Sequence, residues 1–140
     1  MITSFWFAIY ALFFVFLSTN VIKARHKSKT AFGEGDSIIL QQAIRAHANF
    51  TEYTPIFLIG IYICESRLPA NLIILTLLAA MFLVGRLLHF YALTKHEIYE
   101  NNILKNSIKP RVIAMGITFF CLISLSLIAL FNVCSIIINY

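Results

Sequence analysis

Five polar side chains recur at helical spacing inside an apolar stretch of this 140-residue sequence. Because successive helix residues are about 100° apart, these five share one face, at spacings near i, i+4 and i+7. They are Gln41, Gln42, Arg45, Asn49 and Glu52. Arg45 can bind a carboxylate through two hydrogen bonds, Glu52 can accept from an ammonium group, and Asn49 can bond an amide. A small zwitterionic peptide has all of these groups.

The stripe also has a purely structural interpretation. Arg45 and Glu52 could neutralise each other with Asn49 bridging them, because charges near lipid persist when they are paired. Farther along the chain, Arg86 and His89 are three residues apart and lie on one helical face. An unpaired arginine inside a membrane requires an anionic partner or a water-filled cleft. Spacing alone leaves both hypotheses open.

The surrounding sequence is that of an integral membrane protein. It is 60% hydrophobic and only 12% charged, with a mean hydropathy of +0.85. Apolar runs long enough to cross about 30 Å of hydrocarbon predict four transmembrane helices. The predicted helices cover residues 2–22, 38–63, 68–93 and 111–138. We therefore expect an all-α, membrane-embedded four-helix bundle forming a single domain over residues 1–140.

The net charge of +5 follows the ends of these helices, which argues against a nucleic-acid-binding face. Basic residues occupy the first connection (Lys23, Arg25, Lys27, Lys29) and the third (Lys95, Lys105, Lys109, Arg111), whereas the second has only Arg67 beside Glu65. The positive-inside rule then predicts cytoplasmic basic loops and outward-facing termini. The first helix has its positive charges after the apolar run, opposite to a cleaved signal, so we expect it to be retained.

Glycine, proline and cysteine residues indicate local features of the chain. Gly33 and Gly35 predict a turn before a helix cap at Asp36 and Ser37, and Pro69 suits the first turn of the third helix. The cysteines show no metal-ligand spacing, so we predict packing roles for them and no metal site; they are Cys64, Cys121 and Cys134. Four helices leave polar groups near lipid, which favours a homo-oligomer.

Residues 45–55, read as Arg45-Ala-x-x-Asn49-x-x-Glu52-Tyr53-x-Pro55, resemble the signature of the MAPEG family, the membrane-associated proteins in eicosanoid and glutathione metabolism. The resemblance extends over nearly the whole chain, including Gly85-Arg86 in the third helix. It implies a homotrimer with glutathione bound between subunits near the cytoplasmic side. The chain resembles bacterial members of the family whose substrates are largely unassigned, and this similarity implies an inner-membrane location.

The resemblance also implies roles for individual residues. Glutathione would contact Arg45, His47, Asn49, Glu52, Tyr53, Arg86 and His89, with His47 reaching it from the neighbouring subunit. His47 projects from the opposite side of the helix to Arg45, so one helix can serve two interfaces. His89 and Leu93 stand where better-known eukaryotic members have tyrosines. The arginine that activates the glutathione thiol in those members has Arg111 as its first candidate here and Arg25 as its second.

We therefore predict a glutathione transferase or peroxidase with glutathione as co-substrate. A guanidinium near the thiol would stabilise the thiolate, which would attack a hydrophobic electrophile or a lipid peroxide arriving from the bilayer. His89 could donate a proton or serve as a hydrogen-bonded structural histidine. The rival hypothesis is a non-enzymatic lipid-binding or scaffold protein of the same fold. A third is a small transporter or proton path through His47, Glu52 and His89, for which four helices leave little room.

Overall fold

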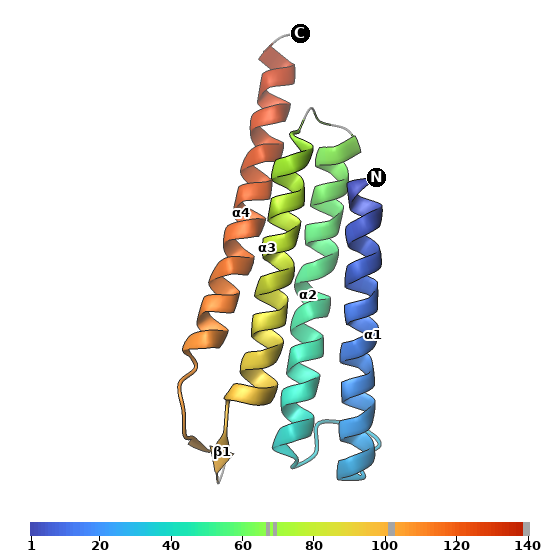
Figure 1. Ribbon diagram of the computed structural model, residues 1–140, viewed down its shortest axis with the longest axis vertical. Coiled ribbons are helices and arrows are strands. Elements are labelled where there is room, and N and C mark those ends of the chain that lie inside the picture. The colour runs from blue at the N-terminus through green and yellow to red at the C-terminus, as the bar shows by residue number, and fades with distance from the viewer. Residues whose placement is uncertain (67, 69, 101–102, 139–140) are drawn as a thin grey trace.

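A computed structural model describes residues 1–66, 68, 70–100 and 103–138 of the chain. Its long helices are α1 (Ile2–Ser28), α2 (Ile38–Ser66), α3 (Leu72–Tyr91) and α4 (Lys109–Ile138). Figure 1 shows them side by side, with both chain ends at one end of the bundle. The α1–α2 connection and the segment between α3 and α4 lie together at the opposite end, called here the loop end. The predicted helical bundle is therefore confirmed.

Two predicted helix boundaries were wrong. The first helix continues to Ser28 rather than residue 22, and Lys29 ends it in the left-handed conformation, with φ 52°. The third begins at Leu72 rather than residue 68, because Asn71 accepts from the backbone N–H groups of Ile73 (2.9 Å) and Ile74 (3.3 Å). The sequence suggested a loop charge at Arg67 and a helix start at Pro69. Both residues lie outside the described part of the chain.

Three helices of the described chain are long and apolar enough to cross a membrane: Ile2–Ser28, Leu72–His96 and Lys109–Ile138. Four transmembrane helices were predicted, and α2 is the one missing from this set, because its polar stripe lowers its hydropathy. It nevertheless lies alongside the other helices, and its 29 residues reach about 43 Å at 1.5 Å per residue. α2 is therefore long enough to span the same thickness as its neighbours.

The segment between α3 and α4 contains elements that the all-α prediction did not include. α3 continues into a wide helical turn, η1 (Ala92–His96). The strands β1 (Tyr99–Glu100) and β2 (Ile103–Leu104) then pair antiparallel, with Tyr99 opposite Leu104. This segment brings Glu97 and Tyr99 back toward the start of α4.

Aromatic packing and one close helix contact hold the bundle together. Tyr10 lies in the centre of the core, and its hydroxyl donates to the carbonyl of Ala79 at 2.8 Å. Around it, the rings of Phe57 and Phe82 stack with centroids 4.0 Å apart. A Cβ at Gly85 would lie only 3.1 Å from Ile117 Cγ2, so a glycine there lets α3 approach α4 closely. That approach sets the next residue, Arg86, against α4.

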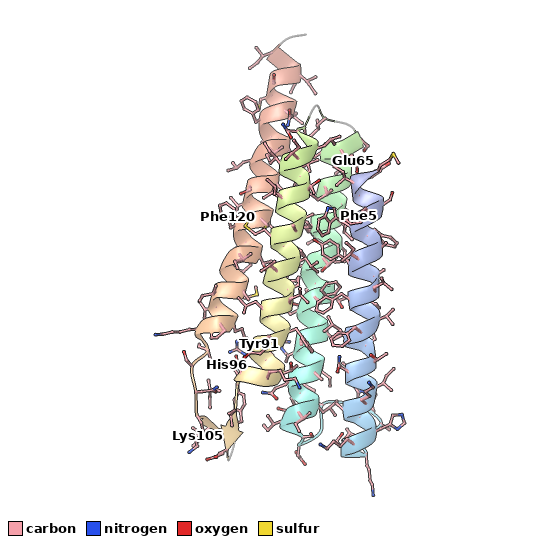
Figure 2. All side chains as sticks on the ribbon, viewed as in Figure 1. Phe5, Glu65, Tyr91, His96, Lys105 and Phe120 are labelled. Atoms are coloured by element: carbon pink, nitrogen blue, oxygen red, sulfur yellow. The ribbon has the colours of Figure 1, made fainter. Side chains whose placement is uncertain are left out.

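Glu65, near the end of α2, joins α2 to the start of α1 at the end of the bundle away from the loop end (Figure 2). Its carboxylate accepts from the backbone N–H groups of Ile2 (2.7 Å) and Thr3 (2.8 Å) and from the Thr3 hydroxyl (2.6 Å). These are the unpaired donors of the first turn of α1, which a carboxylate satisfies well. A residue that the sequence suggested only as a loop charge therefore fixes α1 against α2.

Candidate functional site

A cavity of about 610 Å³ opens between α2, α3 and α4, toward the loop end of the bundle. Four of the polar residues singled out in the sequence line it: Arg45, Asn49, His89 and Arg111. Apolar residues complete its wall, mainly from α4: Leu93, Ile108, Val112, Met115, Gly116 and Phe119. The cavity is within the usual size range of small-molecule sites.

Arg86 lies directly behind this cavity and is only 2% exposed. Its guanidinium donates to Asn49 Oδ1 and to the Thr118 hydroxyl. The same group lies 5.4 Å from the ring centroid of Tyr53 and 5.5 Å from that of Phe82. Its Nε has no hydrogen-bond partner among the described residues. A full positive charge is thus buried with neutral partners only.

The ion pair between Arg45 and Glu52, one of the two alternatives that spacing left open, is absent from the described residues. Among the described residues, the ion pairs are Met1–Glu65, Lys105–Glu100 and Arg111–Glu97. Arg45 and Glu52 are both exposed, while Asn49, the expected bridge between them, bonds Arg86 instead. In the described part of the chain, the two charged residues of the α2 stripe therefore do not form an ion pair with each other.

Arg111 at the start of α4 is held by an acid that the sequence did not single out. Its Nε and one terminal nitrogen each lie 3.3 Å from an oxygen of Glu97. The Tyr99 hydroxyl donates to the same carboxylate at 2.9 Å, and Gln42 donates to the backbone carbonyl of Glu97. Burial raises the pKa of the Tyr99 phenol, and its bond to Glu97 adds to that increase. Arg111 is therefore positioned by the β-hairpin segment at the rim of the cavity.

The remaining predicted residues lie apart from this cavity's lining. Tyr53 packs between Arg86 and Phe119, with its ring centroid 5.9 Å from that of Phe119. His47 points toward α1, where its Nε2 lies 3.1 Å from the Ser18 hydroxyl. Arg25 donates to the carbonyl of Gly33 at 2.9 Å, in the α1–α2 connection. The described chain thus brings only part of the predicted set together at this cavity.

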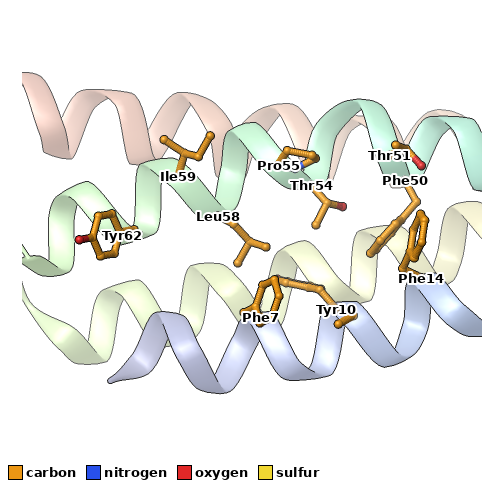
Figure 3. Close-up of a pocket in the computed structure, with 11 residues that line it drawn as sticks. Phe7, Tyr10, Phe14, Phe50, Thr51, Thr54, Pro55, Leu58, Ile59 and Tyr62 are labelled. Atoms are coloured by element: carbon orange, nitrogen blue, oxygen red, sulfur yellow. The ribbon is translucent and has the colours of Figure 1, made fainter.

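A second, apolar groove of about 560 Å³ runs between α1 and α2 (Figure 3). It is lined from both helices by residues that include Phe7, Phe14, Thr54, Pro55 and Tyr62. Its wall includes Phe14, whose ring lies 5.0 Å from that of His47. α2 therefore presents one polar cavity toward α4 and one apolar groove toward α1, with exposed Glu52 belonging to neither lining.

Sequence reasoning missed two residues that shape this site, Glu97 and Thr118. Glu97 lies in an irregular segment where no periodicity indicates its direction. Thr118 does carry a signal, because Ala114 and Thr118 are small residues one turn apart on a helix, a spacing typical of close helix contacts in membranes. Cys64 and Cys121 are buried and Cys134 is exposed. The described residues contain no group of three or more His, Cys, Asp or Glu that could hold a metal ion.

Comparison with known proteins agrees with this architecture. The model of the MAPEG family matches residues 3–131. The inner membrane protein YecN of Escherichia coli K12 is 31% identical over 100 residues, which cover 71% of this chain and 75% of YecN. YecN from strain O6:H1 of the same species matches to the same extent. The chain belongs to the MAPEG family. Together with its apolar helices, the relationship to YecN identifies it as an integral inner-membrane protein.

Proposed function

We propose that this protein binds glutathione in the cavity between α2, α3 and α4 and activates it for reaction with a hydrophobic electrophile. Glutathione offers a carboxylate to Arg45, its thiol to Arg111 and an amide to Asn49, three residues that line the cavity. Its ammonium group would reach Glu52, which lies outside that lining but on the same stripe of α2. The fold family is one in which glutathione-related activity is typical.

The buried charge of Arg86 is the observation that carries this proposal. A cation with neutral partners only is costly in a dry interior, and an anion nearby offsets that cost. Arg86 shares Asn49 with the cavity, and Arg45 and Arg111 line the same space. Three guanidinium groups therefore generate a positive potential there, of which Glu97 offsets only the part at Arg111.

We also propose that the functional unit is a homotrimer with each site shared between subunits. Exposed Arg45 and Glu52 on the outer face of α2 would otherwise meet lipid, which is costly for unpaired charges. If a second copy covers this face, the α1–α2 side of one subunit meets the α2–α4 side of its neighbour. His47 and Ser18 of one subunit would then complete a cavity lined by Arg45 of the next.

Calorimetry on the purified protein tests glutathione binding. We expect wild type to bind, and Glu52→Gln to weaken binding by at least about tenfold, since a hydrogen bond to a charged group contributes about 1.5 to 3 kcal/mol. Glu100→Gln is the matched control, because it makes the same chemical change in the exposed β-hairpin and should leave affinity unchanged. No heat of binding with wild type would instead favour the lipid-binding or scaffold function, which the substitution of His89 and Leu93 for family tyrosines also favours.

Co-expression of two defective subunits tests whether sites are shared. His47→Ala and Arg45→Ala proteins, produced together in equal amounts and tagged differently, should form mixed trimers. If each site takes His47 from one subunit and Arg45 from the next, roughly a quarter of the sites in randomly mixed trimers are intact. Calorimetry should then recover about that fraction of wild-type sites. No recovery in confirmed mixed trimers would place both residues in a site within one subunit.

A further inference from the structure

A smaller cavity, of about 350 Å³, lies at the loop end between α1, the start of α2 and the end of α3. Three lysines line it: Lys23 and Lys27 from α1, and Lys95 from η1. It shares no lining residue with the candidate glutathione site, and it faces α1 rather than α4. The two cavities are therefore separate sites.

Helical spacing brings the polar groups of this cavity together. Asn20, Lys23 and Lys27 are three and four residues apart, so they form one stripe on α1. Thr94 precedes Lys95 at the end of the α3 segment, and Gln42 contributes from α2. None of the three lysines forms an ion pair in the part of the chain that the structure describes. Three unpaired ammonium groups thus surround this space, while the polar side chains beside them donate to backbone carbonyls: Asn20 to Phe16, Gln42 to Glu97 and Thr94 to Phe90.

We propose that this cavity binds the phosphate-bearing headgroup of an anionic phospholipid. Lysine ammonium groups bind phosphate oxygens as point charges. The Asn20 amide nitrogen donates one hydrogen to the Phe16 carbonyl at 2.9 Å and has a second hydrogen for a ligand. Basic cavities between membrane helices, at the boundary with water, suit such headgroups.

The surface next to the cavity selects a lipid over a free phosphate ion. The α1 stripe that carries the lysines continues into the membrane as Phe16 and Leu12, which are 46% and 74% exposed. The Phe16 ring contacts the ring of Phe90 in α3, with centroids 5.3 Å apart, and Phe90 forms part of the cavity wall. Leu87, one turn earlier in α3, is 44% exposed. A basic pocket followed by an exposed apolar strip matches a headgroup followed by acyl chains.

Other lysines in the basic connections provide a matched comparison. Lys29, Lys105 and Lys109 contribute equally to the basic loops but do not line this cavity. Lys105 is already paired with Glu100 at 3.3 Å. Charges needed only for membrane orientation would be interchangeable between the two sets, whereas a headgroup site requires Lys23, Lys27 and Lys95 in particular.

Native mass spectrometry of the full-length protein released from neutral micelles tests the proposal. Phosphatidylglycerol is titrated against wild type, against the triple variant Lys23→Gln, Lys27→Gln, Lys95→Gln, and against the control triple Lys29→Gln, Lys105→Gln, Lys109→Gln. Phosphatidylcholine and inorganic phosphate are the comparison ligands. We expect phosphatidylglycerol to bind wild type and the control equally, and the first triple at least about tenfold more weakly. The single variant Lys27→Gln gives a second reading if the triple fails to fold.

Three results would overturn the proposal. Equal weakening in both triple variants would mean that phosphatidylglycerol responds only to overall charge. Equal binding of phosphatidylcholine by wild type would mean that the headgroup charge is not recognised. Displacement of phosphatidylglycerol by inorganic phosphate at comparable concentrations would identify a site for a free anion. Thermal unfolding in phosphatidylcholine, expected to be the same for all variants, checks that the lysine changes leave the fold intact.

Discussion

Replacing Asn49 with alanine should destabilise the protein by about 2 to 3 kcal/mol. Asn49 Oδ1 accepts from the guanidinium of Arg86, which is 2% exposed. Its loss leaves a buried charge with one partner fewer, and hydrogen bonds to charged groups contribute about 1.5 to 3 kcal/mol. Equilibrium unfolding in mixed micelles at fixed protein concentration, followed by circular dichroism, measures the loss.

Three companion variants show whether Arg86 causes this effect. Thr118→Val removes the other side-chain oxygen to which Arg86 donates, with little change of shape, and should also cost about 1.5 to 3 kcal/mol. In an Arg86→Met background, Asn49→Ala should cost much less, because the charge that needed the amide is gone. Equal costs of Asn49→Ala with and without Arg86 would contradict the explanation.

Asn49→Asp separates stability from binding. A carboxylate of similar shape still accepts from Arg86 and neutralises it within the protein, so the fold should be retained. The same change places a negative charge in the cavity lined by Arg45 and Arg111. We therefore expect a well-folded protein that has lost at least about tenfold in glutathione affinity. Unchanged affinity would mean that the positive potential of the cavity does not attract the ligand.

The helical bundle and the polar stripe could be predicted from the sequence because both depend on local periodicity. Apolar runs indicated where helices lie, and a spacing of 3.6 residues indicated which side chains share a face. The opposite directions of Arg45 and His47 follow from that period alone, and the structure sends them to different sides of α2.

Partners between helices could not be predicted in the same way. Whether Asn49 bridges Arg45 to Glu52 or bonds Arg86 depends on how α3 and α4 approach α2, which Gly85 helps to determine. Glu97 was missed for a similar reason, since its direction depends on η1 and the hairpin rather than on a helical repeat. Helix boundaries at residues 22 and 68 failed because polar residues extend α1 beyond its apolar run and because Asn71, not the connection before it, caps α3.

Replacing Arg111 with glutamine should raise the pKa of bound glutathione thiol by about two units. A free thiol has a pKa of about 8.5, and a guanidinium in a partly dry cleft stabilises its thiolate. Two units correspond to about 2.7 kcal/mol, a reasonable contribution from one arginine. With wild type the thiolate should therefore form at lower pH than free glutathione, whereas with Arg111→Gln its titration midpoint should move up toward the free value. Ultraviolet absorbance of the thiolate, recorded against pH at saturating glutathione, measures the midpoint.

Replacing Glu97 should change the pKa of the bound glutathione thiol in the opposite direction to replacing Arg111. Its carboxylate lies 3.3 Å from Arg111 and offsets part of that residue's positive potential. Glu97→Gln can still accept from Tyr99 and Arg111 but removes the negative charge, so the thiol midpoint should move further down if Arg111 is the activating group.

Arg25→Gln changes a residue that bonds the α1–α2 connection and should leave the midpoint unaltered. A midpoint that responds to Arg25 alone would transfer thiol activation to that residue. A midpoint equal to that of free glutathione in wild type would mean that bound glutathione is held without activation, since a guanidinium close enough to act on the sulfur cannot leave its pKa unchanged.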